Sequence, residues 1–302
     1  MKPDLHSCMR VGIVHGMAYP GAAQDTGILL ESVRSVCCDP FFESIEVTHI
    51  EDPEARTEVA KLLQGSHMEV GFACQPVQLG RKLDLNAFDE AARAAAVRAV
   101  KELLAEAVEL GATKLAVVSG PDPGPARREE AIELLVDSLG EVCAAAEALG
   151  ISVVLEVFDR GIDKKALIGS TRDAVRVAAR LRPRFPDFGL MLDLSHLPLQ
   201  GERPRAAVEL ARDYITHIHV GNCVLEPGHP LYGDLHPPFG IPGGVNDVDE
   251  LAEFLRALWR IGYLQDGGER TVAFEVRPRE GEASEIVIAN AKRTLLAAWR
   301  RV

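Results

Sequence analysis

Eight short apolar segments recur along the chain, and segments rich in helix-forming residues separate most of them. We predict strands over residues 10–16, 44–50, 67–76, 113–120, 152–159, 188–196, 215–222 and 271–278. The clearest helical segments span residues 86–110, 126–149 and 282–300, where Ala, Leu, Glu and Arg are frequent. Alternating strands and helices favour parallel pairing, because a crossover connection returns the chain to the same edge of a sheet. Eight such units predict an α/β fold, a closed (β/α)8 TIM barrel.

A doubly wound open sheet is the alternative fold, and it usually carries a glycine-rich phosphate turn after its first strand. The first strand here runs instead into the sequence HGMAY at residues 15–19, which is not such a turn. A length of 302 residues is ordinary for one barrel, and no linker or change of composition divides the chain. We therefore expect a single barrel domain over residues 1–302.

The formal net charge of −12 makes nucleic acid an unexpected partner, because an acidic surface repels phosphate backbones. The chain contains no apolar run of the roughly 18 residues that a membrane helix needs. Residues 1–10 lack the apolar core of a signal peptide, and the six cysteines show no CxxC spacing. These features predict a cytoplasmic protein with no membrane partner.

Each of the last four predicted strands carries an ionisable residue near its C-terminal end, and these are Glu156, Asp193, His219 and Glu275. One such residue alone is more often an ion-pair partner, for which Arg160 and Arg277 are available. Four on successive strands are harder to explain in this way. Unpaired buried charge costs several kcal/mol, and converging carboxylates repel one another. A divalent cation resolves both problems, and this donor set suits Mn²⁺, Mg²⁺, Co²⁺ or Zn²⁺.

A long segment after the seventh predicted strand, residues 223–245, is rich in Gly and Pro and shows no periodicity. Loops of this length inside a compact domain are usually functional. In a barrel, the loop would lie over the C-terminal mouth, where such folds place their chemistry. We therefore expect the loop to take part in the site.

The pieces Leu155-Glu156, Asp193-x-x-His196, His217-x-His219 and Phe274-Glu275 together resemble the xylose isomerase-like TIM barrel superfamily. That superfamily contains sugar isomerases, ketose 3-epimerases, inosose dehydratases and AP endonucleases. The resemblance is clear over strands five to eight. Elsewhere it rests only on the alternation of strands and helices along the chain. It implies that Glu156, Asp193, His219 and Glu275 are metal ligands, and that His196 touches substrate or a second metal. It also implies a homodimer or homotetramer.

The loop sequence Asp234-Leu235-His236 resembles the D-x-H motif of AP endonucleases. The resemblance implies a possible second metal on His196, Asp234 and His236. Alternatively, Asp234 and His236 bind substrate hydroxyls or cap a turn. The AP endonuclease resemblance fails elsewhere, because the ends of strands three and four read Cys74-Gln75 and SG at 119–120 where those enzymes have histidines.

Ketose 3-epimerases place an arginine shortly after the strand-seven histidine, whereas residues 223–245 contain neither Arg nor Lys. A Pro-Gly turn at residues 242–243 does resemble theirs. The substrate contacts are therefore expected to differ. We find neither a P-loop nor a basic clamp, which favours a neutral sugar or polyol as the small-molecule substrate over a phosphorylated one.

The resemblance implies proton transfer next to a carbonyl through an enediolate, with Glu156 and Glu275 exchanging the proton and His196 stabilising the oxyanion. Further candidates for the substrate pocket are His15, His49, Gln75 and Arg277, although a local hydrogen bond at the rim explains the first three equally well. An isomerase or epimerase is the first expectation. A metal-dependent dehydratase or lyase acting on a keto-polyol is the alternative. An AP endonuclease-like phosphoesterase and a non-catalytic sugar-binding barrel rank lower.

Overall fold

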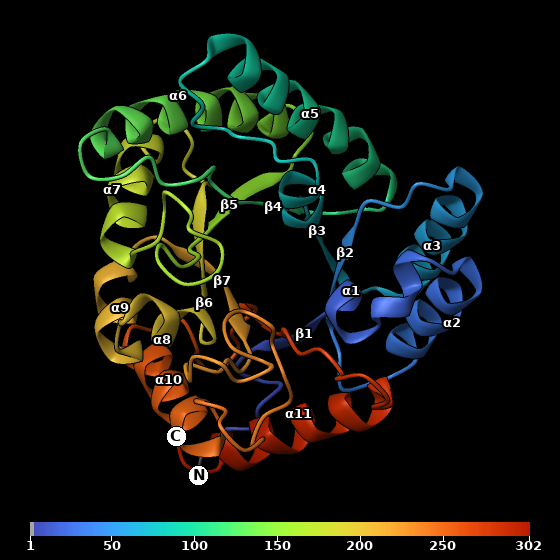
Figure 1. Cartoon of the computed structure of the whole chain (residues 1–302). Coiled ribbons are helices and arrows are strands. Elements are labelled where there is room, and N and C mark those ends of the chain that lie inside the picture. Colours follow the sequence, from blue (N-terminus) through green and yellow to red (C-terminus); the bar gives the residue numbers. More distant parts are fainter. Residues whose placement is uncertain (1–2) are drawn as a thin grey trace.

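Residues 3–302 are described by the computed structural model, and over this range eight parallel strands close into one barrel (Figure 1). Each strand pairs with the next, and β8 pairs with β1. The strands are β1 (Arg10–Val14), β2 (Ser44–Thr48), β3 (Glu69–Ala73), β4 (Lys114–Val117), β5 (Ser152–Glu156), β6 (Gly189–Asp193), β7 (Ile215–Val220) and β8 (Thr271–Phe274). The predicted (β/α)8 barrel is therefore confirmed.

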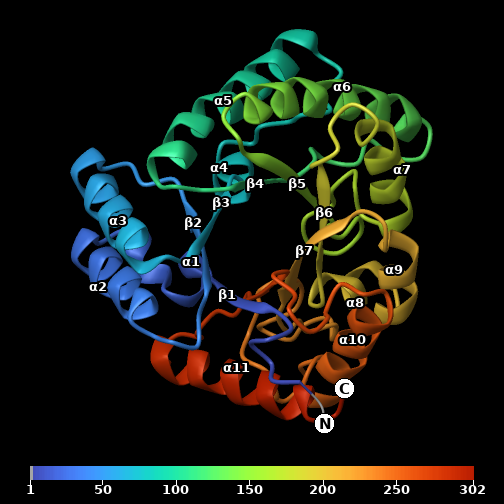
Figure 2. The same ribbon diagram turned by 180° about the vertical axis from the view of Figure 1, so that it is seen from behind.

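A ring of helices surrounds the barrel (Figures 1 and 2). Pro3 and Val302, the first and last described residues, lie near each other beside α11. The ring is built from α2 (Thr26–Cys37), α3 (Pro53–Ser66), α5 (Glu90–Glu109), α6 (Arg128–Glu147), α7 (Thr171–Leu181), α9 (Pro204–Ala211), α10 (Val248–Arg260) and α11 (Ser284–Trp299). Shorter helices follow the C-terminal ends of β1, β3 and β6, namely α1 (His15–Ala18) with the 3-10 turn η1 (Pro20–Ala23), α4 (Gln75–Gly80) and α8 (His196–Gln200). These short helices begin within the mouth of the barrel.

Several element ends differ from the predicted ranges. The third strand is shorter than 67–76, because His67 ends α3 in the left-handed region at φ 55° and Gln75 already begins α4. The long helix predicted from residue 86 begins at Glu90, where the Asp89 carboxylate accepts from the backbone of Ala92. Such N-terminal caps satisfy backbone donors that the helix itself leaves unpaired.

The interior of the barrel is filled rather than open. Ala116, Val154 and Met191 form a small apolar cluster there, and the buried side chains of Glu46 and His217 lie beside it. The packing leaves a void of only about 10 Å³. This packed layer forms the floor beneath the C-terminal mouth.

The chain between β7 and α10 projects inside the ring of helices, between β7, β1 and α11 (orange in Figure 1). Two asparagines hold its ends together. Asn222 Oδ1 accepts from the backbone of Cys223 and Asn246, and its Nδ2 donates to Pro238. Asn246 Nδ2 donates to the carbonyls of Leu194 and Gly221. These bonds fix the loop against the strand ends.

Within residues 3–302, no helix has both the length and the apolar composition needed to cross a bilayer. The six cysteines are free, and four of them are buried.

Candidate metal centre

The ends of β5, β6, β7 and β8 bring together one oxygen or nitrogen from each of Glu156, Asp193, His219 and Glu275, all within 4.8 Å of one another. His219 Nδ1 lies 2.7 Å from Glu275 Oε2 and 3.7 Å from Glu156 Oε1. The side chain of Glu275 is 14% exposed and that of Glu156 only 3%. Glu275 is therefore the more exposed of the two glutamates.

The strand register explains how these residues meet. Asp193 and His219 are direct partners on β6 and β7. Glu156 pairs with Met191, two residues before Asp193, and Glu275 follows the strand partner of His219 by two residues. A closed barrel needs this stagger because its strands are tilted, so residues offset along the strands lie at a similar height.

Two carboxylate oxygens of the group, Glu156 Oε1 and Asp193 Oδ2, are buried and accept no hydrogen bond from any described residue. Leaving such atoms unpaired in a dry interior is costly. Three carboxylates and one imidazole are the donors that hard and borderline divalent ions take. The unpaired oxygens and the donor set therefore fit a divalent metal.

The pKa values of the carboxylates also reflect crowding. Burial, followed by the charge of Glu275, raises the pKa of Glu156 to about 7. Burial likewise raises the pKa of Asp193. For Glu275 burial acts in the same direction, but His236 and His219 outweigh it and lower the pKa to about 2. Positive charge near Glu156 and Asp193 is thus insufficient to offset the cost of burying them.

A second group adjoins the first. His196 Nε2 lies 3.0 Å and His236 Nε2 2.8 Å from Asp234 Oδ1. His196 Nδ1 donates to the Val157 carbonyl. The predicted residues His196, Asp234 and His236 therefore meet in the structure, beside Asp193.

Close approach of the loop to the strands needs two unusual backbone positions. His236 has a positive φ of 49°, which few residues other than glycine adopt. At Gly221 an added Cβ would lie 2.4 Å from the Glu275 carbonyl oxygen and 3.1 Å from His236 Nδ1. Gly221 therefore gives His236 the space to reach the site.

Residues 41–285 match the family described as xylose isomerase-like TIM barrel. The chain belongs to this family. The resemblance inferred from the strand-end motifs is thus confirmed.

The xylose isomerase-like fold extends over nearly the whole chain in comparisons with solved structures. An L-ribulose 3-epimerase superposes with a TM-score of 0.75 at 20% identity, covering 97% of this chain and 96% of that one. An IolI protein with a bound zinc atom superposes with a TM-score of 0.73 at 18% identity, covering 97% and 99%. At these identities the likeness shows the fold alone.

One curated relative is similar in sequence over part of its length. D-psicose 3-epimerase from Ruminiclostridium cellulolyticum is 30% identical over 91 residues, which is 30% of this chain and 30% of the relative.

The other predicted pocket residues of this xylose isomerase-like barrel lie in different places. Gln75 reaches the candidate metal centre, where its Nε2 donates to Glu156 Oε2 at 2.6 Å. Arg277 is exposed, and its side chain lines a separate surface depression with Tyr19 and Leu235. Its backbone N–H donates to the His236 carbonyl.

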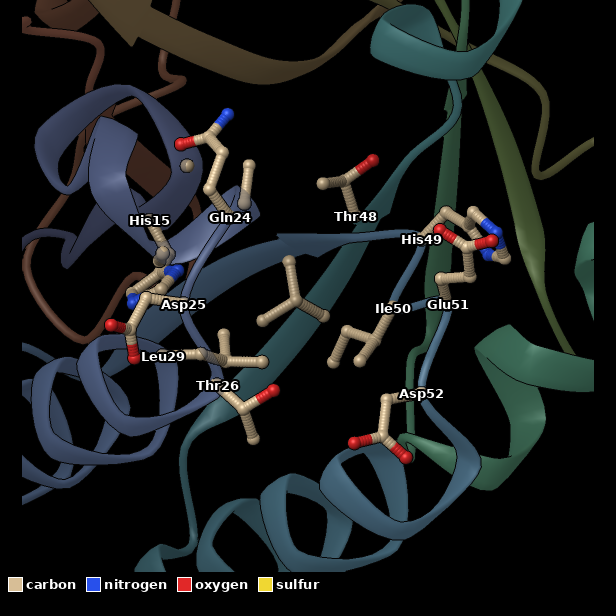
Figure 3. Close-up of a pocket in the computed structure, with 14 residues that line it drawn as sticks. His15, Gln24, Asp25, Thr26, Leu29, Thr48, His49, Ile50, Glu51 and Asp52 are labelled. Carbon is tan, nitrogen blue, oxygen red and sulfur yellow. The ribbon is translucent and has the colours of Figure 1, made fainter.

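His15 and His49 line a cavity of about 460 Å³ at the ends of β1 and β2, and they approach it from opposite sides (Figure 3). His15 is buried, contacts Ser32 Oγ at 2.8 Å and stacks on Tyr19. His49 Nδ1 lies 2.6 Å from Glu106 Oε2. Each imidazole thus makes the local contact expected of a rim residue.

Two charged residues that the sequence did not single out, Glu46 and Lys164, contact the candidate metal centre and the group beside it. Glu46, at the centre of β2, lies against His217 and His219. Lys164 Nζ lies 3.0 Å from Asp234 Oδ2. The carboxylate of Asp159 accepts from the backbone of residues 162–164 and so orders the turn that presents Lys164. An acidic residue inside an apolar strand was the available signal for Glu46, whereas Lys164 had none.

Proposed function

We propose that this chain is a divalent-metal-dependent sugar isomerase or epimerase that transfers a proton next to a carbonyl through an enediolate. The convergence of Glu156, Asp193, His219 and Glu275, with two buried carboxylate oxygens lacking a partner in residues 3–302, carries the proposal. The superfamily resemblance and the epimerase names of the relatives support the class of reaction.

Glu156, Asp193, His219 and Glu275 would hold one metal ion. When bound, it supplies positive charge that polarises the carbonyl and hydroxyl oxygens of a sugar. The candidates remain Mn²⁺, Mg²⁺, Co²⁺ and Zn²⁺, and the zinc in the IolI structure supports a site of this kind in the fold.

The protein's own groups perform the proton transfer in this proposal. Glu156 ends β5 and Glu275 directly follows β8, so in this proposal they flank a substrate lying over the mouth, and one removes the proton that the other returns. Gln75 Nε2 donates to Glu156 Oε2 and so orients this carboxylate, whose Oε1 has no hydrogen-bond partner within residues 3–302. His196 Nδ1 donates to the Val157 carbonyl and its Nε2 lies 3.0 Å from Asp234 Oδ1, so in this proposal the Nε2–H would stabilise the developing oxyanion once substrate is bound.

The group of His196, Asp234 and His236 is assigned to substrate hydroxyls rather than to a second metal. Lys164 already places a positive charge 3.0 Å from Asp234 Oδ2, so the need for a further cation is smaller there. The ends of β3 and β4 carry Gln75 and Ser119 in place of the histidines of AP endonucleases, which disfavours a phosphoesterase.

A dehydratase acting on a keto-polyol is the second candidate. It shares the proton-removal step and then expels hydroxide from the enediolate. The absence of Arg and Lys from residues 223–245 favours it, since the arginine typical of ketose 3-epimerases is missing. The two reactions differ in their products, whereas the same residues would bind the metal in both.

Incorporation of deuterium from solvent tests the proposal. The chain is incubated in ²H₂O with Mn²⁺ and a panel of neutral ketoses and inososes, and label next to the carbonyl is followed by NMR. We expect label with at least one neutral substrate, and its loss in Glu156→Gln. Metal-loaded protein that binds a sugar without any exchange would be a sugar-binding barrel and would contradict the proposal.

A further inference from the structure

Glu46 is a buried carboxylate on β2 that the proposed reaction does not use. Its Oε1 lies 2.8 Å from His217 Nε2, and its Oε1 and Oε2 lie 2.9 and 3.0 Å from His219 Nε2. All three side chains are at most 4% exposed. Glu46 therefore joins both histidines of β7 from the opposite wall of the barrel.

The barrel is shaped to admit this carboxylate. A Cβ at residue 71 on β3 would approach Glu46 Cγ to 3.0 Å, so Gly71 leaves the space that the side chain occupies. Ala116, Val154 and Met191 line the same interior void of about 10 Å³ as Glu46, together with Lys114 and His217, so the carboxylate lies in a tightly packed layer. Hydrogen bonds in such a buried layer are stronger than in water.

The contact with Glu46 requires a hydrogen on Nε2 of His219. A carboxylate oxygen only accepts, so His219 Nε2 must donate to Glu46. Nδ1 is the nitrogen that faces Glu275 and Glu156, at 2.7 and 3.7 Å. Glu275 Oε2 also only accepts, so in the metal-free chain Nδ1 carries hydrogen as well. A cation held by Glu156, Asp193 and Glu275 would replace the hydrogen on Nδ1, while Glu46 keeps the one on Nε2.

We propose that Glu46 is a positioning residue that holds His219 in its Nε2–H form, so that His219 binds the metal through Nδ1. This inference rests on the metal site of the proposed function. Partners of this kind set the ring orientation and tautomer of metal-binding histidines. His217 donates to the same carboxylate and restrains it from the other side.

Glu46→Gln is the informative variant, because an amide has one accepting and one donating end. With its oxygen in the place of Oε1, which faces both Nε2 atoms, its NH₂ group takes the place of Oε2, 3.0 Å from His219 Nε2, where two donors oppose each other. Glu46→Asp keeps a carboxylate on a shorter stem. Glu69→Gln is the matched control, since Glu69 stands on β3 and contacts Lys114 and Thr271, away from the four proposed ligands.

The metal affinity of each variant is measured by titration with Co²⁺ against a competing chelator, followed by the absorption spectrum. We expect the dissociation constant of Glu46→Gln to rise about 10- to 100-fold, as for other partners of metal-binding histidines. Glu46→Asp should recover part of the loss, and Glu69→Gln should match the unchanged chain. Equal affinity in Glu46→Gln and the unchanged chain would overturn the inference.

A second measurement needs no variant and therefore survives a failure of Glu46→Gln to fold. In the ¹⁵N-labelled, Zn²⁺-loaded chain, His219 should show hydrogen on Nε2 and metal on Nδ1, and the reverse assignment would overturn the inference. The deuterium assay separates this from the proposed function. Metal binding that depends on Glu46 without any exchange contradicts the function alone, and exchange with affinity independent of Glu46 contradicts the inference alone.

Discussion

Glu275 Oε2 lies 2.7 Å from His219 Nδ1, so adjacent strands β8 and β7 hold a carboxylate and an imidazole at contact distance. Both side chains would bind the proposed metal. Glu275 is also the more exposed of the two glutamates proposed to move the proton. The reaction and the metal site therefore depend on the same few atoms.

Glu275→Gln should lower the rate of deuterium exchange about 10²- to 10⁴-fold, since loss of a general acid–base group costs this much. Rates are measured at saturating Mn²⁺, which offsets weaker metal binding. Glu282→Gln is a control because Glu282 only forms an ion pair with Arg279. A rate close to that of the unchanged chain would exclude Glu275 from proton transfer.

Lys164→Met should create a second metal site. Without the ammonium group, Asp234, His196 and His236 form a buried donor set that lacks a positive partner on Asp234 Oδ2. We expect one divalent ion per chain before the substitution and two after it, measured by elemental analysis of dialysed protein. Lys165→Met, at the exposed neighbour, should still bind one. Two ions in the unchanged chain would show that Lys164 does not take this role.

Gly221→Ala should destabilise the chain by about 1–3 kcal/mol, the cost of overpacking a tight interior. The added Cβ would meet the Glu275 carbonyl at 2.4 Å, and relief requires β7 and β8 to separate. Urea denaturation measures the free energy of unfolding. Gly161→Ala is the control because a Cβ there meets nothing within 4 Å. Equal stability of both variants would argue against this close approach.

The stability of the chain should depend on the protonation of His15. Burial lowers the pKa of His15 from 6.5 to about 4, so the unfolded chain binds this proton more readily. The neutral side chain therefore contributes stability above pH 6.5 that is lost as the pH falls towards 4. Between about pH 7.5 and about pH 5, the unchanged chain should lose about 2 kcal/mol relative to His15→Gln. If the free energies of unfolding of the unchanged chain and of His15→Gln changed equally with pH, this prediction would be wrong.

The barrel and the proposed ligands were predictable because their signals are local. Strands and helices alternate along the sequence, and Glu156, Asp193, His219 and Glu275 each interrupt an apolar strand near its end. The closed order of strands then brings these ends together without further information.

Glu46 does interrupt an apolar strand, but its role depends on a contact across the barrel, between β2 and β7, which no local pattern contains. On the same strand we predicted His49 as a pocket residue instead, because it directly follows the end of β2. Alternation places Ser44, Glu46 and Thr48 on one face of β2 and His49 outside that face. The position of Lys164 depends on a turn that the Asp159 carboxylate orders, and hydrophobic periodicity does not predict such a turn.

Removal and return of the metal tests the central claim most directly. The chain is treated with a chelator, and deuterium incorporation next to the carbonyl of a neutral ketose or inosose is measured before and after Mn²⁺ is added. The account predicts no incorporation by the stripped chain and recovery with Mn²⁺ in the unchanged chain but not in Asp193→Asn. Incorporation that persists after complete removal of metal, at the rate of the loaded chain, would contradict it.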